Sequence, residues 1–109
     1  MNYSIEAIPK FEKELKKLAK KYPSIKTEFT DLVDSLEKEP RQGAFLGNNC
    51  YKIRLAIASK GKGKSGGARI ITNILIENTT VYLLSIYDKS NKANLTDKEL
   101  SDLLKDIPK

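Results

Sequence analysis

Residues 68–88 read ARIITNILIENTTVYLLSIYD, and this stretch decides the fold. Two runs rich in β-branched and other apolar residues, 68–76 and 81–87, flank the polar tetrapeptide 77–80, ENTT. Apolar runs of this length on either side of a turn signal predict two antiparallel strands joined as a hairpin. The centre of the chain is therefore expected to build a sheet.

A further strand is predicted immediately upstream. In the segment 51–58, YKIRLAIA, large apolar residues alternate with other residues, and Lys52 and Arg54 fall on the same side of the alternation. Side chains two apart in a strand point to the same face, so this strand carries a basic row on one face. A loop rich in glycine and lysine, 59–67, connects it to the strand at 68–76.

The N-terminal third predicts helices instead. A short β-like segment, 2–8, is followed by Pro9, which the first turn of a helix tolerates. Apolar residues then recur at helical spacing in two segments that the tripeptide 22–24, YPS, separates and that Pro40 ends. These two stripes are Phe11, Leu15, Leu18 and Tyr22, then Ile25, Phe29, Leu32, Val33 and Leu36.

The last element is a short C-terminal helix. Thr96 and Glu99 form a capping box, and Leu100, Leu103, Leu104 and Ile107 make its apolar stripe. The whole chain, 1–109, is thus expected to be a single α+β domain with the order β-α-α-β-β-β-α. An antiparallel-dominated sheet packs against the helical hairpin, with helices mostly on one face.

Composition excludes several classes of site. The chain has no histidine and a single cysteine, so it offers no catalytic histidine, no intramolecular disulfide and no cysteine-based zinc site. No apolar run approaches the roughly 20 residues of a membrane span, and the first 20 residues lack the apolar core of a signal peptide. We expect a cytoplasmic protein that works without metal or cofactor and without a membrane.

The net charge of +6 is concentrated in one segment. Residues 40–76 hold seven basic residues and no acidic one, whereas the rest of the chain holds thirteen basic and fourteen acidic residues. An acid-free basic segment is the electrostatic signature of a protein that binds a polyanion. A merely solubilising surface is the alternative, and the concentration of charge in one segment favours the polyanion.

The glycine- and lysine-rich loop imitates a nucleotide-binding motif. Residues 58–65, ASKGKGKS, lack one glycine of the phosphate-binding loop GxxxxGK[ST], because Ala58 stands at its first position. That motif also needs a helix after it, whereas a β-branched strand follows here. We interpret the loop as a flexible connection whose mobile cations approach phosphates: Lys60, Lys62 and Lys64.

The predicted hairpins bring basic residues from three strands together. Lys52 and Arg54 share a face, Arg69 begins the next strand, and Tyr87 and Lys89 end the last one. Such a patch suits RNA cleavage by attack of the ribose 2′-hydroxyl on the adjacent phosphate, which needs no metal. A lysine whose pKa neighbouring cations lower accepts a proton, arginine holds the phosphorane, and tyrosine stacks on a base or relays a proton.

These residues resemble a known family. The strand 50–55, CYKIRL, the passage 61–71, GKGKSGGARII, and the passage 81–96, VYLLSIYDKSNKANLT, are similar to toxins of the RelE/ParE superfamily, nearest to its RelE/HigB-like branch. The resemblance covers about Pro40 to Thr96. It implies a toxin of a type II toxin–antitoxin system, an endoribonuclease that cleaves mRNA in the ribosomal A site. Its partners would be a cognate antitoxin, mRNA and the 30S ribosomal subunit, with operator DNA bound only through the antitoxin complex.

The resemblance also implies roles for individual residues. Arg69 matches the arginine that stabilises the transition state, Lys52 and Arg54 match the basic pair, and Lys89 falls near the residue that assists the leaving group. Leu95 stands in the region where some members carry a stacking tyrosine, and the general base stays unassigned. Two alternatives remain: a ParE-like toxin that poisons DNA gyrase, and a degenerate toxin kept as an antitoxin-binding co-repressor.

Overall fold

A computed structural model describes residues 2–60, 67–90 and 95–107. Along the chain, one strand is followed by two helices, then by four strands, and a third helix lies near the C-terminus. In order they are β1 (Ser4–Ala7), α1 (Pro9–Lys21), α2 (Ile25–Lys38), β2 (Ala44–Gly47), β3 (Cys50–Leu55), the 3₁₀ turn η1 (Ala58–Lys60), β4 (Ala68–Leu75), η3 (Ile76–Asn78), β5 (Thr80–Asp88) and α3 (Asp97–Leu104).

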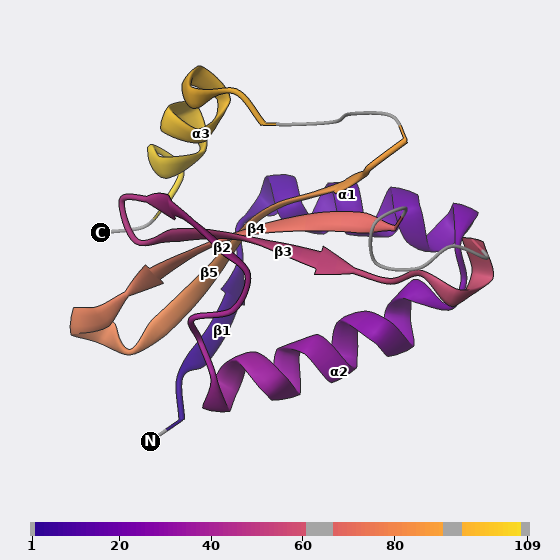
Figure 1. Cartoon of the computed structure of the whole chain (residues 1–109), viewed down its shortest axis with the longest axis horizontal. Helices are drawn as coiled ribbons and strands as arrows, with labels where there is room; N and C mark the ends of the chain where they lie inside the picture. Colours follow the sequence, from indigo (N-terminus) through magenta and orange to yellow (C-terminus); the bar gives the residue numbers. More distant parts are fainter. Residues whose placement is uncertain (1, 61–66, 91–94, 108–109) are drawn as a thin grey trace.

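The five strands form one sheet in the order β1-β5-β4-β3-β2 (Figure 1). Pairing is antiparallel everywhere except between β1 and β5, which run parallel. The predicted α+β class and the antiparallel-dominated sheet are therefore confirmed. The central hairpin β4–β5 is the one that residues 68–88 predicted, and Arg69 is the second residue of its first strand.

The strand β2 is an addition to the predicted order. Only four residues long, AFLG, it pairs with β3 through Ala44 opposite Lys52 and Phe45 opposite Tyr51. The turn between β2 and β3 uses Asn48 and Asn49 with φ of 52° and 60°, in the left-handed region that asparagine tolerates. The residues AFLG show no alternation of apolar and polar side chains, which is why the sequence pattern did not reveal this strand.

Three boundaries also differ from the predicted ones. The strand expected over 51–58 ends at Leu55, and Ala58 begins η1 instead. The expected turn at 77–80 is the 3₁₀ turn η3 followed by Thr79 at φ 46°. The helix α3 ends at Leu104, so that Ile107 lies beyond it, although the predicted capping box of Thr96 and Glu99 is present.

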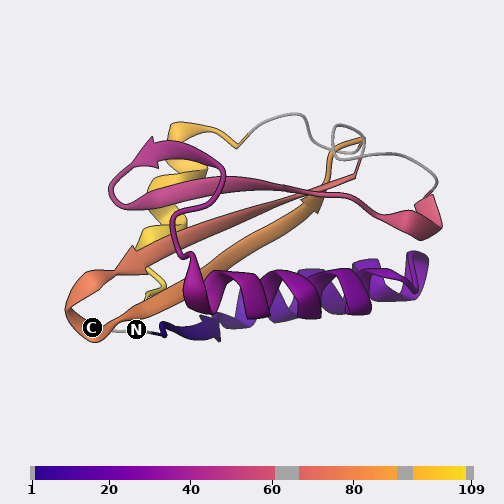
Figure 2. The same ribbon diagram turned by 60° about the horizontal axis from the view of Figure 1, so that its bottom comes forward.

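One face of the sheet carries the core under the helical hairpin. Ile53, Ile70 and Ile86 lie opposite one another in register across β3, β4 and β5, and each is at most 5% exposed. Figure 2 shows α1 and α2 side by side along this face. Phe11 of α1 is fully buried and packs on Phe29 of α2 with ring centroids 5.6 Å apart. Because this face is apolar, the other face is available for polar chemistry.

The helix α3 lies over the opposite face, at one end of it. A hollow there is lined by Asn73 and Leu75 of β4 together with Leu104 and Ile107. At the same end, Cys50 is fully buried and accepts a hydrogen bond from Asn73 Nδ2 at 3.3 Å. Burial raises the pKa of the Cys50 thiol, and the Asn73 hydrogen bond lowers it by less. The cysteine is thus a packed strand residue.

A glutamate of α1 completes the edge of β5 beyond β1. Glu14 Oε1 accepts hydrogen bonds from Ser85 Oγ at 2.9 Å and from the Ile86 backbone N–H at 3.3 Å. Its other oxygen, Oε2, pairs with Lys10 Nζ at 2.8 Å. β1 pairs with β5 only as far as Leu83, so the carboxylate replaces the strand that is missing there.

We expect Glu14→Ala to destabilise the fold by about 1–3 kcal/mol, because the buried Ile86 N–H and Ser85 hydroxyl lose their acceptor. The exposed Glu12 on the same helix provides the matched control, and Glu12→Ala should cost about 0.5 kcal/mol or less. Urea unfolding followed by circular dichroism measures both. Equal losses for the two variants would contradict the role given to Glu14.

Candidate active site

The strand register places two arginines and a tyrosine in one row. Arg54 of β3 lies directly opposite Arg69 of β4, which lies directly opposite Tyr87 of β5. Partners in register project to the same face of a sheet, so the three side chains share the face away from the helical hairpin. Lys52 precedes Arg54 by two residues on the same face, about 6–7 Å away along the strand.

The row passes from exposed to buried across the sheet. Arg54 is exposed, Lys52 and Lys89 are half-buried, and Arg69 and Tyr87 are only 3% and 8% exposed. The sequence predicted that these residues converge, and they do share one end of the sheet. It did not predict the burial of Arg69, whose Nη1 also donates to the Ala68 carbonyl oxygen at 3.2 Å. Packing therefore fixes this guanidinium, whereas Arg54 can move.

Tyr87 is held as a neutral phenol. Burial raises the pKa of its hydroxyl, and the positive charge of Arg69 lowers it by less. The net effect keeps the proton on the phenol throughout the neutral range. In this position Tyr87 can donate a hydrogen bond or a proton, and its burial leaves little ring surface for stacking on a base.

The backbone at Gly67 joins the ends of three strands. The Lys89 N–H donates to the Gly67 carbonyl oxygen at 3.0 Å, which extends the β4–β5 pairing beyond Ala68 and Asp88. A Cβ at position 67 would lie 2.1 Å from the Leu55 carbonyl oxygen of β3. Only glycine permits this approach, and Arg69 follows two residues later.

Three cations of the site have no counter-ion in the described structure. Within residues 2–60, 67–90 and 95–107, the side chains of Lys52, Arg54 and Lys89 make no ion pair or hydrogen bond. Lys52 and Arg54 line a hollow of about 450 Å³ with Gln42, Gly43 and Ala44 at the start of β2. The hollow is thus a cationic surface whose charges are available to a ligand.

The loop cations fall largely outside what the structure describes. Lys62 and Lys64 lie outside the described residues, and for Lys60 only the backbone, at the end of η1, is described. The start of η1 is fastened to α2 and the turn before it. The Ala58 N–H donates to Glu28 Oε2 at 2.6 Å, and the Ser59 N–H donates to Ser24 Oγ at 2.9 Å.

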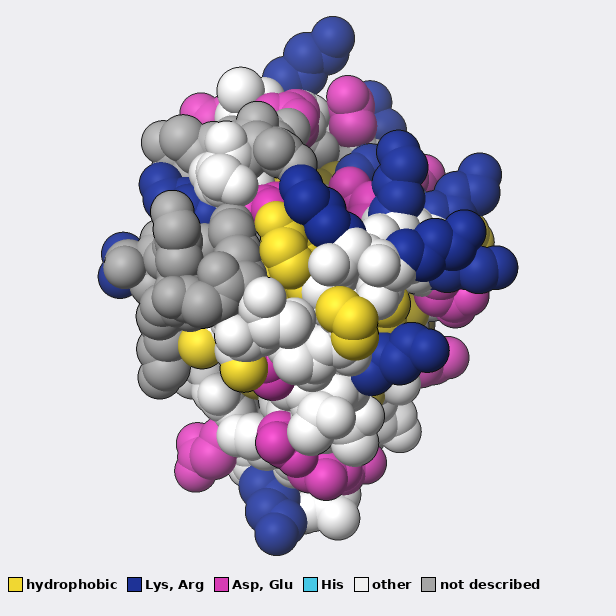
Figure 3. All heavy atoms as spheres, turned by 90° about the vertical axis from the view of Figure 1, so that its right-hand side faces the viewer, with side chains coloured by type: hydrophobic (Ala, Val, Ile, Leu, Met, Phe, Trp, Pro, Cys, Tyr) yellow, Lys and Arg dark blue, Asp and Glu magenta, His cyan; other side chains and the backbone are white. Residues whose placement is uncertain are grey.

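A second basic surface lies on α1. The sequence did not indicate it, because basic and acidic residues nearly cancel in number outside 40–76. Six exposed lysines occupy the outer side of this helix: Lys10, Lys13, Lys16, Lys17, Lys20 and Lys21. Their spacing keeps them within one broad helical face. Figure 3 shows lysine and arginine side chains gathered along this side of the molecule. Acidic residues elsewhere balance these lysines in number but not in position.

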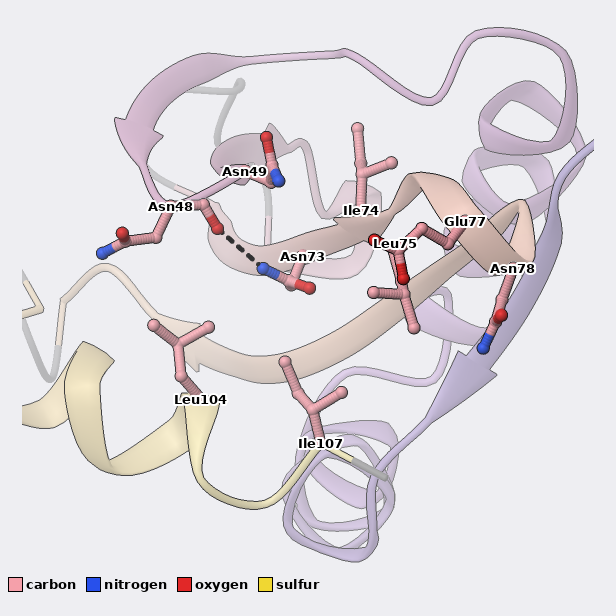
Figure 4. A pocket seen from close by; sticks show the side chains of 9 residues that line it. All are labelled: Asn48, Asn49, Asn73, Ile74, Leu75, Glu77, Asn78, Leu104 and Ile107. Carbon is pink, nitrogen blue, oxygen red and sulfur yellow. Dashed lines mark hydrogen bonds between the residues drawn. The ribbon is translucent and has the colours of Figure 1, made fainter. Parts of the chain in front are cut away.

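Another hollow, of about 660 Å³, has a different character (Figure 4). Asparagines and apolar side chains line it, and Asn73 Nδ2 donates to the Asn48 carbonyl oxygen at 2.9 Å across it. Among the described residues that line it, Glu77 is the only charged one. A lining in which no described residue is a cation does not suit a phosphate, so the site is assigned to the other end of the sheet.

None of the described helices is long and apolar enough to cross a membrane. Nor do the described residues form a group of three or more His, Cys, Asp or Glu side chains that could hold a metal ion.

Comparison with known proteins identifies the relatives of this chain. A family model described as the RelE toxin of the RelE/RelB toxin–antitoxin system matches residues 10–108. An arginine double mutant of E. coli toxin RelE in the free state is similar with a TM-score of 0.67 and 21% identity, over 99% of this chain and 100% of that one. The toxin–antitoxin complex RelBE2 from Mycobacterium tuberculosis is similar with a TM-score of 0.59 and 19% identity, over 81% of this chain and 99% of that one. The intact E. coli RelBE complex is similar with a TM-score of 0.61 and 21% identity, over 79% of this chain and 95% of that one. At these identities the structural likeness is one of fold.

We predict that Gly67→Ala destabilises the protein by about 2–3 kcal/mol, because its Cβ would overlap the β3 backbone. Gly47 is the matched control: its φ of +88° strains any side chain, but nothing lies within 4 Å of its Cβ position. Gly47→Ala should therefore cost only about 1–2 kcal/mol. Urea unfolding compares the two, and a larger loss at Gly47 would refute the close approach at Gly67.

Proposed function

Because the chain belongs to the RelE family of toxins from toxin–antitoxin systems, we propose that it is a ribosome-dependent endoribonuclease that cleaves mRNA in the A site and so arrests translation. The cleavage is proposed to need no metal or cofactor, with the sheet face around Arg54 and Arg69 as its active site. The proposal assigns the chain to the RelE/HigB-like branch rather than to the gyrase poisons.

The proposal is carried by the direct pairing of Arg54 with Arg69. Like charges directly opposite each other destabilise a strand pair. No described acidic side chain forms an ion pair with Arg54 to offset this repulsion. A phosphate between the two guanidinium groups would offset it, because each arginine can donate two hydrogen bonds to phosphate oxygens.

The same geometry supports a division of roles in the reaction. The ribose 2′-oxygen attacks the adjacent phosphorus, its proton passes to a base, and the 5′-oxygen leaves with a proton. Arg69, fixed by packing, would hold the phosphorane charge together with Arg54. Tyr87 keeps its proton and so enters as a donor toward the leaving oxygen. The general base remains open between Lys52 and Lys89, the two half-buried amines of the face.

The ribosome is proposed as the second RNA partner. The lysine face of α1 is separate from the sheet face of Arg54 and is well suited to phosphates of structured RNA. Binding there would present the active site to mRNA in a fixed orientation, which can supply a large part of the rate.

A cognate antitoxin is proposed as the protein partner. The E. coli RelBE and Mycobacterium tuberculosis RelBE2 structures to which the chain is similar are toxin–antitoxin complexes. For this chain we expect an antitoxin whose acidic or apolar segment covers the basic sheet face and blocks access of RNA. Operator DNA would then be contacted only through that complex, and the free toxin would act in the cytoplasm.

We expect induced wild-type protein to stop growth and to leave in-frame mRNA 5′ ends. Arg69→Ala should lower the cleavage rate by about 100-fold or more and restore growth, since the phosphorane loses its fixed guanidinium. Arg41→Ala is the matched control, because Arg41 is exposed and lies in the same acid-free segment but outside the row. Thermal unfolding of purified Arg69→Ala verifies that the variant folds.

Three outcomes would contradict the proposal in different ways. Growth arrest by both wild type and Arg69→Ala, with intact mRNA and induced DNA damage, would favour a gyrase poison. A harmless wild-type protein would favour a degenerate toxin that serves as a co-repressor. Equal loss of cleavage in Arg41→Ala would show that general charge, rather than the Arg54–Arg69 pair, drives the reaction.

Charge reversal on α1 tests the ribosome partner separately. We expect Lys13→Glu with Lys17→Glu to weaken ribosome binding by about tenfold or more at low salt, and to flatten its salt dependence, because phosphate contacts are lost. Cleavage on saturated ribosomes should change little. Lys38→Glu with Lys105→Glu carries the same charge change away from this face, and an equal effect would refute the α1 contact.

A further inference from the structure

A small hollow adjoins the basic row where the start of α3 faces β2 and β3. It measures about 150 Å³ and is lined by Leu46, Lys52, Leu95, Thr96, Asp97 and Leu100. Three leucines make apolar walls, and the remaining lining is polar or charged. Apolar walls with a few polar groups are typical of sites for small ligands.

The two charged residues of this lining are Lys52 and Asp97. Thr96 Oγ1 accepts from the Glu99 N–H at 3.1 Å, and the Thr96 N–H donates to Glu99 Oε1 at 3.0 Å, so the capping box uses both. Among the described residues, Lys52 and Asp97 make no side-chain hydrogen bond or ion pair, even with each other. An ammonium and a carboxylate thus line one hollow without neutralising one another directly.

We propose that this hollow binds one unpaired nucleobase of the RNA and that guanine fits it best. The inference rests on the proposed function, because it places a base of the same RNA strand beside the cleavage site. The leucines would contact the faces of the ring. Lys52 would donate to the guanine O6, and Asp97 would accept from its N1–H and exocyclic N2–H.

The charges of the hollow favour a base over a phosphate. A carboxylate repels phosphate, whereas it accepts readily from the two adjacent N–H groups of guanine. The ammonium supplies a donor, and guanine O6 is a common acceptor for lysine. Bases of single-stranded RNA expose this Watson–Crick edge.

The position of the hollow fits a single RNA strand. Lys52 lines both this hollow and the larger one that it shares with Arg54. The two side chains are separated by about 6–7 Å along β3, which is close to the length of one nucleotide in an extended strand. A phosphate at the Arg54–Arg69 pair would therefore place a neighbouring base at the hollow. Asp97 acts here in recognition and has no part in the chemical step.

The test measures binding without cleavage. A fluorescent pentanucleotide with 2′-O-methyl riboses, which cannot attack the phosphate, carries either one guanine or one hypoxanthine, which lacks the N2 amino group. Anisotropy titration gives the dissociation constants for wild type, Asp97→Asn and Asp102→Asn. Asp102 is the matched control: it lies on α3, its side chain is 58% exposed, and it does not line the hollow.

We expect wild type and Asp102→Asn to bind the guanine oligonucleotide about tenfold more tightly than the hypoxanthine one, as loss of a charged hydrogen bond predicts. Asp97→Asn should bind the two about equally. Wild type that binds both equally, or binds neither, overturns the proposal, and so does an Asp97→Asn variant that keeps the preference.

Two further readouts separate this inference from the proposed function. If wild type does not cleave mRNA but still prefers the guanine oligonucleotide, the proposed nuclease activity is wrong and the proposed base-binding site is supported. An Asp97→Asn variant with unchanged base preference that the antitoxin no longer neutralises would assign the hollow to the antitoxin and overturn the base site.

Discussion

The pairing of Arg54 with Arg69 is the constraint on which the rest of the site depends. Two cations in direct register would separate if the strands were free to slip. The strands are not free, because Ile53, Ile70 and Ile86 form the matching row on the other face and are buried under α1 and α2. A slip by one residue would expose this whole row. The hydrophobic face therefore holds in place an arrangement of charge that the polar face alone would not keep.

At two places where a strand ends, a single residue determines how the neighbouring backbone is held. Glu14 supplies acceptors to β5 beyond the short β1, and Gly67 lets the chain pass close to the β3 backbone before Arg69. Neither residue belongs to the polar row. Both determine where its members lie, because Arg69 and Tyr87 sit within two residues of these two contacts.

Much of this arrangement is predictable from the sequence, and the features that are not predictable have identifiable physical reasons. The alternation in 51–58 and the two runs of 68–88 predict the central strands. The register that sets Tyr87 opposite Arg69 also depends on a bulge between Ile71 and Thr72, which the sequence pattern does not reveal. β2, AFLG, has no alternation of apolar and polar residues that would predict a strand. The burial of Arg69 depends on packing that no local pattern encodes. The α1 lysines do not show as an excess of positive charge in the sequence, because Glu and Asp residues of other elements balance them in number. In the structure the helix separates these lysines from those acidic residues.

The graded burial across the row bears on how such a site could perform acid–base chemistry without histidine. Tyr87 loses hydration and has a raised pKa, so it can donate a proton but not accept one at neutral pH. The proton acceptor must then be another residue of the row, and Lys52 and Lys89 are its half-buried amines. Lys52 lies between the arginine pair and the leucine-walled hollow, where it would bind a base edge. If that lysine is engaged in recognition, the proton falls to Lys89, whose backbone is fixed to Gly67 at the opposite side of the row.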